Sequence, residues 1–226
     1  MQISFLNRLS ANLLTVIAKT ASYTSTLQIE GISHLEAVRT AGHSALWSAW
    51  HGQTMLLSTF LRYLGDHPLT CLIPNDWRGE TLFHLLNNVG VRPYPINLEK
   101  TDMKTARKLA QLVKLIKKEG SDNFLAPDGP SGPSYVVKPG AFFLSEKVGA
   151  PILPIGAYSR AVYKVKRWDA YALPFPFARI SINIGEPIML PKETATQEKS
   201  AVLTAALHQV TMQAEANFYA AYANTR

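Results

Sequence analysis

The chain has 226 residues, of which 47% are hydrophobic and 17% are charged, and its formal net charge is +7. These values predict one compact domain with a substantial core, and they exclude a disordered chain or a repeat array. The basic balance favours an acidic partner such as an anionic membrane surface, whereas no basic run alternates with stacking aromatics, so we expect no nucleic-acid partner. The single cysteine, Cys71, excludes an intrachain disulfide and lies in an apolar run that predicts a buried strand.

The N-terminal segment predicts an amphipathic helix. Apolar side chains recur at helical spacing at Phe5, Leu6, Leu9, Leu13, Val16 and Ile17. Arg8 and Lys19 lie off this stripe, and the stretch suits neither a secretory signal nor a membrane span. The pattern leaves open whether the helix packs on its own domain or lies in a membrane interface. We therefore expect an N-terminal helical segment over residues 1–28 and an α/β domain over residues 29–226.

The rest of the chain alternates between short apolar runs and helical patterns. The predicted strands span residues 44–50, 69–74, 91–96, 123–126, 152–157 and 179–184. The predicted helices span residues 51–64, 79–89, 102–119 and 139–148, and a closing helix spans 194–222. This alternation predicts a single α/β domain with a mostly parallel central sheet flanked by helices. Residues 168–178, rich in proline and aromatics, predict a loop or lid.

Polar residues follow the first four predicted strands. His51 follows the first, Asn75 and Asp76 the second, Asn97 the third and Asp128 the fourth. Ligands of open α/β sheets bind beyond the carboxyl ends of the strands, so we expect these side chains to gather at one edge.

His51 opens a predicted helix, and Gly52 after it would allow a substrate to approach the ring closely. N–H groups at a helix start favour an anion or a developing oxyanion. The alternative is a half-buried histidine that only caps the helix.

The stretch "FLAPDGPSGPSYVVKPGA" over residues 124–141 is the strongest local motif. Its prolines and glycines fix a rigid turn directly after a strand, and its backbone N–H groups are candidates for holding a phosphate. An Asp-Gly turn chosen for backbone geometry alone would explain only the "PDG" part. The candidate substrate-binding residues of this loop are Pro127, Gly129, Pro130, Ser131, Gly132 and Lys138.

The stretch "IPNDWRGETLFHLL" over residues 73–86 adds charged residues at a strand-to-helix junction. Arg78 is a candidate phosphate ligand, and Asp76 either orients His51 or caps the helix. The remaining candidate substrate-binding residues are Asn75, Gly79, Glu80 and Asn97.

The stretches "WHG", "NDWRGE", "FLAPDGPSGP…VKPGA" and "GAPILPIG" follow one another between residues 44 and 187. In this order they resemble the lysophospholipid acyltransferase superfamily of glycerolipid and lipid A acyltransferases, and most of all its bacterial branch long labelled a domain of unknown function. The resemblance implies transfer of a fatty acyl group from acyl-coenzyme A or acyl carrier protein to a hydroxyl of a lysophospholipid-like acceptor. It implies no bound cofactor or metal, His51 as general base, and a cytoplasmic place on the inner face of the cell membrane.

One departure from the superfamily concerns the partner of His51. The superfamily places an acid five residues after its histidine, where this chain has Leu56. The partner must then come from another strand end, and Asp128 is favoured narrowly over Asp76 because its loop is the more rigid. Two other functions stay open: a lipid-binding protein that has lost the reaction, which Leu56 favours, and a lipid or ester hydrolase that uses His51, Asp76 and Asp128.

Overall fold

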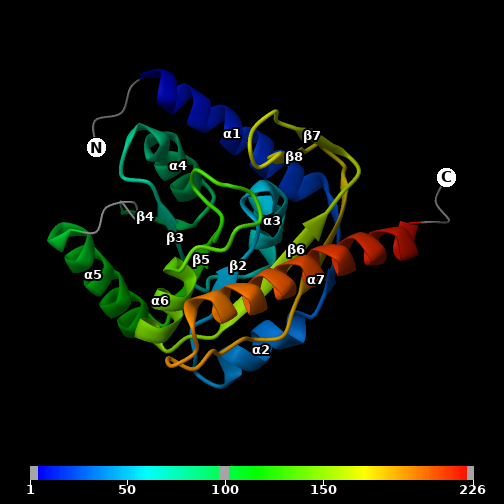
Figure 1. The fold of residues 1–226 in the computed structure, drawn as a ribbon. Coiled ribbons are helices and arrows are strands. Elements are labelled where there is room, and N and C mark those ends of the chain that lie inside the picture. The colour runs from blue at the N-terminus through cyan, green and yellow to red at the C-terminus, as the bar shows by residue number, and fades with distance from the viewer. Residues whose placement is uncertain (1–4, 97–101, 223–226) are drawn as a thin grey trace.

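The computed structural model describes residues 5–96 and 102–222, and its centre is a seven-stranded sheet in the order β1-β9-β6-β2-β5-β3-β4 (Figure 1). The strands are β1 (Thr26–Glu30), β2 (Leu46–Ser48), β3 (Leu69–Ile73), β4 (Arg92–Pro95), β5 (Asp122–Leu125), β6 (Ile152–Tyr158) and β9 (Arg179–Ile184). All neighbouring pairs are parallel except β6 and β9. The predicted α/β fold with a mostly parallel sheet is confirmed. Asn97, a predicted site residue, lies outside the described residues.

Helices cover both faces of the sheet. They are α1 (Phe5–Thr24), α2 (Ile32–Thr40), α3 (Thr54–Ser58), α4 (Trp77–Asn88), α5 (Met103–Glu119), α6 (Gly140–Val148) and α7 (Thr196–Tyr222). On one face, Leu112 of α5 and Leu207 of α7 pack with Leu46 of β2 in one core cluster. On the other face, Val38 of α2 packs with Trp47, the next residue of β2, in a second cluster. Adjacent strand residues thus point to opposite faces, as the pleat requires.

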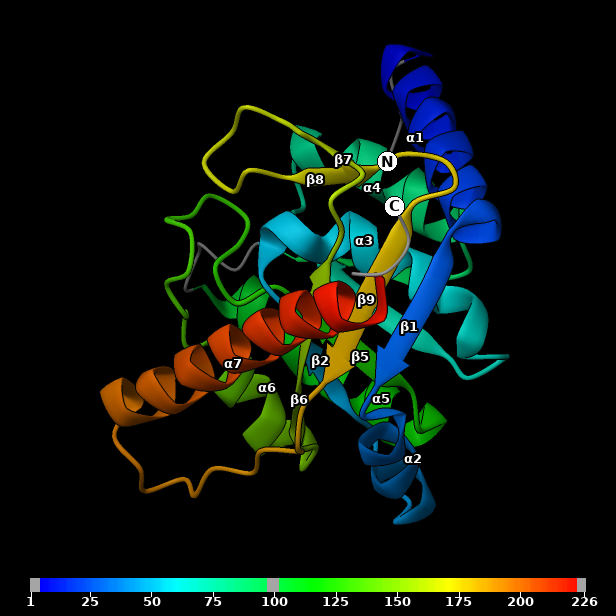
Figure 2. The ribbon, with the colours of Figure 1, turned by 90° about the vertical axis from the view of Figure 1, so that its right-hand side faces the viewer.

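Helix α1 lies outside α4, on the face away from α5 (Figures 1 and 2). It packs through small residues, because Ala11 and Ala18 are buried whereas Leu9, Leu13 and Val16 are 58 to 61% exposed. The helix therefore contacts its own domain and still presents a row of large apolar side chains to solvent. No helix among the described residues is long and apolar enough to cross a membrane.

The segment after β2 differs from the single helix predicted over residues 51–64. It consists of a 3-10 turn η1 (His51–Gln53), the short helix α3, and a second 3-10 stretch η2 (Thr59–Tyr63). The hydroxyls of Thr54, Ser58 and Thr59 each donate to a carbonyl three residues earlier. Hydroxyls that bond to nearby carbonyls compete with regular helical bonding, which accounts for the interrupted helix.

A hairpin of β7 (Val162–Lys164) and β8 (Ala172–Pro174) stands outside the main sheet and was not predicted. Residues 168–178 are therefore not loop throughout, since they contain β8. Strands β7 and β8 pair only with each other, in a separate two-stranded sheet. Their sequences lack the continuous apolar runs of the central strands, which is why the hairpin was not predicted. This hairpin carries the loop that completes the candidate site.

Candidate active site

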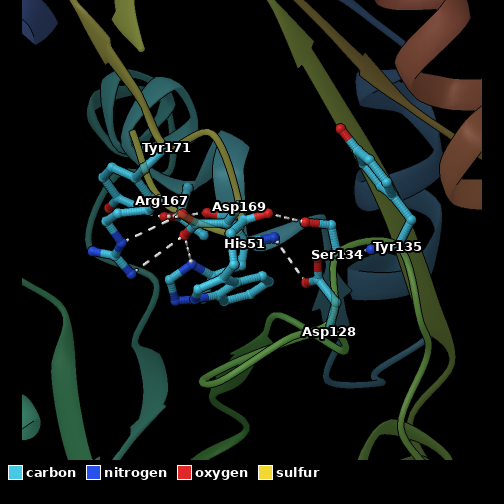
Figure 3. A network of polar contacts seen from close by, with 9 residues as sticks. His51, Asp128, Ser134, Tyr135, Arg167, Asp169 and Tyr171 are labelled. Atoms are coloured by element: carbon cyan, nitrogen blue, oxygen red, sulfur yellow. Dashed lines mark hydrogen bonds and ion pairs between the residues drawn. The ribbon is translucent and has the colours of Figure 1, made fainter. Parts of the chain in front are cut away.

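His51 begins η1 directly after β2, and its ring is paired with an acid from the hairpin (Figure 3). Its Nδ1 lies 2.7 Å from Oδ2 of Asp169, whose side chain is completely buried, while the His51 side chain is 21% exposed. A carboxylate on Nδ1 fixes the orientation of the ring and leaves Nε2 as the nitrogen that can take a proton from a substrate.

The segment 167–171, with sequence RWDAY, surrounds the His51 ring; we call it the RWDAY segment. The Trp168 and Tyr171 rings have centroids 5.3 and 5.7 Å from that of His51. The Tyr171 hydroxyl and Thr54 Oγ1 are hydrogen-bonded at 2.9 Å. Burial raises the pKa of Tyr171, so its phenol stays protonated at neutral pH. Two aromatic rings and one acid thus hold the imidazole from a single five-residue segment.

Arg167 gives the buried Asp169 carboxylate a second partner. The Nε atom of Arg167 lies 3.4 Å from Oδ1 of Asp169, and its Nη2 atom lies 3.4 Å from Oδ2. The guanidinium also lies over the Tyr171 ring, 5.6 Å from the centroid. Because a buried charge is costly unless it is paired, Arg167 and His51 together make this carboxylate tolerable in the interior.

Two glycines let these parts approach one another. A Cβ atom at Gly52 would lie 2.2 Å from the backbone oxygen of Asp169, and one at Gly129 would lie 2.9 Å from Cδ2 of His51. The space beside Gly52, which we predicted to admit a substrate, is thus occupied by the backbone of the RWDAY segment. A larger residue at position 52 would push the hairpin and Asp169 away from the ring.

Asp128 does not orient the His51 ring as predicted. Its Oδ1 accepts the backbone N–H of His51 at 2.9 Å, and its Oδ2 accepts the N–H of Tyr135 at 3.3 Å (Figure 3). Ser48 of β2 pairs with Leu125 of β5, so three residues further on His51 and Asp128 face each other across the edge. The carboxylate therefore meets the backbone N–H of the first residue of η1. The acid on Nδ1 is Asp169, and neither Asp128 nor Asp76 holds that position.

The pKa of Asp128 predicts a pH-dependent contribution to stability. Burial raises this pKa above its ordinary value of 3.8, against the opposing effect of the His51 and Tyr135 N–H groups. Because the folded state holds the proton more tightly than the unfolded chain, the contribution is fully present below the unfolded pKa and is lost as the pH rises through the folded pKa. The free energy of unfolding of the wild type minus that of Asp128→Asn should fall as the pH rises from about 3.5 toward 7. Urea titrations across this range measure the difference, and a constant value would contradict the shift.

The loop after β5 is held largely by its own contacts. Lys138 Nζ donates to the Gly129 carbonyl at 2.8 Å, and the Lys138 N–H donates to the Pro127 carbonyl at 2.9 Å. The Gly129 N–H donates to the Ala126 carbonyl at 3.1 Å. Several groups that we predicted to face a substrate or an oxyanion therefore stabilise the loop itself. Pro130 and Ser131 lie in the same turn, and Gly132 follows it.

The loop also contacts the hairpin, because Ser134 Oγ donates a hydrogen bond to the Trp168 carbonyl (Figure 3). The loop after β5 and the segment between β7 and β8 thus both contact His51, and they also contact each other. Asp128 binds the His51 backbone, Asp169 binds its ring, and Ser134 links the two segments through the Trp168 carbonyl.

The predicted residues after β3 occupy the neighbouring part of the edge. Asn75 lines a groove of about 390 Å³. The Gly79 N–H donates to the Asp76 carbonyl at 3.0 Å in the turn that leads into α4, whose first turn also contains Arg78. Glu80 Oε2 accepts a hydrogen bond from Asn7 at 2.6 Å, which gives it a structural role between α4 and α1.

Cys71 lies in β3, as expected, but the residue is only partly buried, and burial raises the pKa of its thiol to about 12. A thiol with so high a pKa is poorly nucleophilic at neutral pH.

Asp169 was missed because sequence reasoning looked for acids at strand ends of the main sheet. The available signal was an acid between two aromatics in RWDAY, inside a segment interpreted as a lid. An acid in such an apolar stretch needs a partner if it is buried, and here that partner is His51.

Comparisons with known proteins agree with the fold. No family model matches the chain. An uncharacterized protein of Rickettsia prowazekii (strain Madrid E) is 26% identical over 145 residues, so the chain spans 64% of that relative's length. The crystal structure of the 1-acyl-sn-glycerophosphate acyltransferase PlsC from Thermotoga maritima is similar with a TM-score of 0.54 and 15% identity, over 92% of this chain and 80% of that one. The chain therefore has the fold of a solved acyltransferase, as the resemblance implied.

Proposed function

We propose that this protein is an acyltransferase that moves a fatty acyl group from an acyl thioester to a hydroxyl of a lysophospholipid-like acceptor. The observation that carries the proposal is the His51–Asp169 pair at the carboxyl edge of a sheet with the PlsC fold. His51 Nε2 takes the proton of the acceptor hydroxyl while that oxygen attacks the thioester carbonyl. The C–S bond then breaks, the proton passes to the departing thiolate, and an ester and a free thiol result. Acyl-coenzyme A or acyl carrier protein supplies the thioester.

The pair argues against a protein that has kept the fold and lost the reaction. Leu56 was the main support for that alternative, because it stands where the superfamily has its acid. Its side chain is 2% exposed and belongs to the core cluster that contains Phe60. Position 56 is therefore used for packing, and the acid that it does not provide is provided by Asp169.

A single assay separates the proposed function from its two alternatives. The protein is incubated with radiolabelled palmitoyl-coenzyme A and lysophosphatidate, and the products are separated by chromatography. Labelled phosphatidate supports acyl transfer, and labelled free palmitate would indicate a hydrolase. No turnover with retained lipid binding would refute the proposal in favour of a binding protein.

We further propose that the protein acts at the cytoplasmic face of the cell membrane and that α1 provides the contact. Its exposed row of Leu9, Leu13 and Val16 offers apolar surface, and Arg8 and Lys19 offer positive charge. Interfacial helices gain affinity from both features. Phe177, which is 78% exposed, lies beside the end of the helix, because its N–H donates to Thr24 Oγ1 at 3.0 Å, and it adds exposed apolar surface there.

Charged substitutions in this row should weaken membrane binding strongly without unfolding the protein. We expect Leu13→Glu with Val16→Glu to lower partitioning onto phosphatidylglycerol vesicles by at least about tenfold, since each buried aliphatic side chain contributes roughly 1.5–3 kcal/mol. The matched control, Val202→Glu with Met212→Glu, places two charges at exposed apolar positions of α7 and should bind like the wild type. Vesicle co-sedimentation measures both. Equal binding of the two variants would show that α1 serves packing only. Deletion of α1 is the poorer test, because Ala18 packs against Met55 and Leu85.

A further inference from the structure

Helix α5 carries a continuous basic stripe on its exposed face. We define the α5 stripe as Lys104, Arg107, Lys114 and Lys118, which succeed one another at spacings of three or four residues around the exposed Gln111. These positions share one side of a helix. The opposite side is apolar, with Leu112 and Ile116 buried in the core. Within residues 5–96 and 102–222, no ion pair is recorded for any residue of the stripe.

Most of the α5 stripe does not stabilise the helix that carries it, and only Lys118, in the last turn, is placed favourably for the helix dipole. Lys104 and Arg107 lie in the first turns, where the helix dipole disfavours positive charge. Lys104 repels Arg107, and Lys114 repels Lys118, because like charges three or four residues apart are destabilising. Glu119, the one acid of the helix, is paired with Arg92 of β4. A helix that tolerates such repulsion in its free state is suited to an acidic partner that relieves it.

A groove lies beside the stripe, where α5 meets the carboxyl ends of β3 and β4. It has a volume of about 390 Å³ and is lined by Asn75, Phe83, Tyr94, Pro95, Lys108 and Gln111. Gln111 belongs to the exposed face of α5, and Asn75 follows β3. In the sheet, β3 is separated from β2 by β5 alone, so the Asn75 end of the groove is roughly 10 Å from the strand that leads into His51.

The groove offers amide groups, aromatic rings and one ammonium. Lys108 Nζ donates to the Pro95 carbonyl at 3.2 Å, and the Tyr94 hydroxyl donates to the Lys108 carbonyl at 2.8 Å. These bonds hold α5 against the end of β4. Such a lining suits a thin, flexible chain that contains amides and a phosphate, rather than a bulky rigid ligand.

We propose that the α5 stripe docks an acidic carrier protein, and that the carrier's acyl thioester reaches His51 on an amide-containing arm that lies along the groove. This inference rests on the proposed acyl transfer and specifies its donor. A membrane surface is the other anionic partner to consider. However, α1 with its apolar row and α5 cover opposite faces of the sheet (Figures 1 and 2), so a bilayer in contact with α1 lies away from the stripe.

The test reverses two charges of the stripe. The stripe variant carries both Arg107→Glu and Lys114→Glu. The matched control carries both Arg160→Glu and Lys192→Glu, which change the net charge equally at exposed positions elsewhere. Palmitoyl-acyl carrier protein is titrated into each protein, and Kd is measured at several salt concentrations. We expect the stripe variant to raise Kd at least about tenfold at low salt and to flatten its salt dependence, because docked charges act on encounter and are screened by ions. The control should keep the wild-type Kd.

Each outcome bears on one proposal. Equal Kd values for the stripe variant and the control would overturn the docking site, as would loss of vesicle binding by the stripe variant with carrier binding intact. Transfer from palmitoyl-coenzyme A without detectable carrier binding by the wild type would refute the docking site and leave the proposed function in place. Carrier binding that depends on the stripe, without transfer from any donor, would support the docking site and refute the proposed function. Thermal unfolding of both variants verifies that they are folded.

Discussion

Replacement of His51 by asparagine should lower kcat for acyl transfer by at least about 100-fold, the usual scale of general acid–base catalysis. Asparagine keeps an N–H near the place of Nδ1, so it can still donate to the buried Asp169 carboxylate and preserve the fold. It offers no nitrogen that can take up a proton from the acceptor hydroxyl. Initial rates of phosphatidate formation with palmitoyl-coenzyme A measure the effect, and thermal unfolding checks the structure.

His51→Asn needs a control that differs only in position. His43 is exposed in the turn after α2, so His43→Asn changes the same residue type at a distance from the site and should retain wild-type turnover. Near-normal turnover in His51→Asn would remove this residue from the mechanism. An equal loss of turnover in both variants would show that the effect does not come from removing the general base at position 51.

The central elements of the fold could be predicted because their patterns are determined locally. Strand β9 was predicted with its observed bounds, since five of its six residues are buried and three of these are isoleucines. Helix α5 begins after Asp102, whose carboxylate accepts the Thr105 N–H at 2.7 Å, and ends at Gly120 in the left-handed conformation. Both caps were readable as residue types at fixed positions. In contrast, β1 is an edge strand with no buried residue, so its sequence lacks the run that marks the central strands.

The site was harder to predict than the fold, because some of its residues are placed by strand ends and others by tertiary packing. The position of His51 follows from the end of β2, and that of Asp128 from the end of the adjacent β5. These local rules brought the two residues together correctly. They could not show that the carboxylate of Asp128 meets the backbone of His51 rather than its ring. The ring partner comes from a hairpin 118 residues further along the chain, whose placement depends on tertiary packing.

The hairpin also explains why the predicted helix after His51 contributes no acid. Helix α3 and the flanking 3-10 turns direct Leu56 into the core with Phe60, so a carboxylate at position 56 would be buried among apolar side chains. The backbone of Asp169 lies against Gly52, and its carboxylate contacts Nδ1 of the ring.

Asp169→Asn should lower kcat by roughly 10²–10⁴-fold with KM changed little, because it alters the protonation of the imidazole rather than the binding of substrate. In the wild type the Asp169 carboxylate accepts a hydrogen bond from Nδ1–H of His51, so Nε2 carries no proton and can act as the base. An asparagine that turns its amide N–H toward Nδ1 favours the opposite tautomer, in which Nε2 carries the proton and cannot accept another. The side chain keeps its size, and Arg167 next to it is 47% exposed and can be solvated, so the fold should survive.

Nitrogen NMR of His51 gives a readout that a merely structural role of Asp169 would not move. The spectrum of the wild type should show the proton of the neutral ring on Nδ1, and that of Asp169→Asn should show it on Nε2. Asp66→Asn, at an exposed position, is the matched control and should change neither the spectrum nor kcat. Asp128→Asn should act mainly on stability, because its carboxylate accepts two backbone N–H groups. If Asp128→Asn or Asp76→Asn depressed kcat more than Asp169→Asn at equal stability, the orienting role would pass to that residue. An unchanged tautomer with full activity in Asp169→Asn would show that the contact between Asp169 and His51 serves the fold alone.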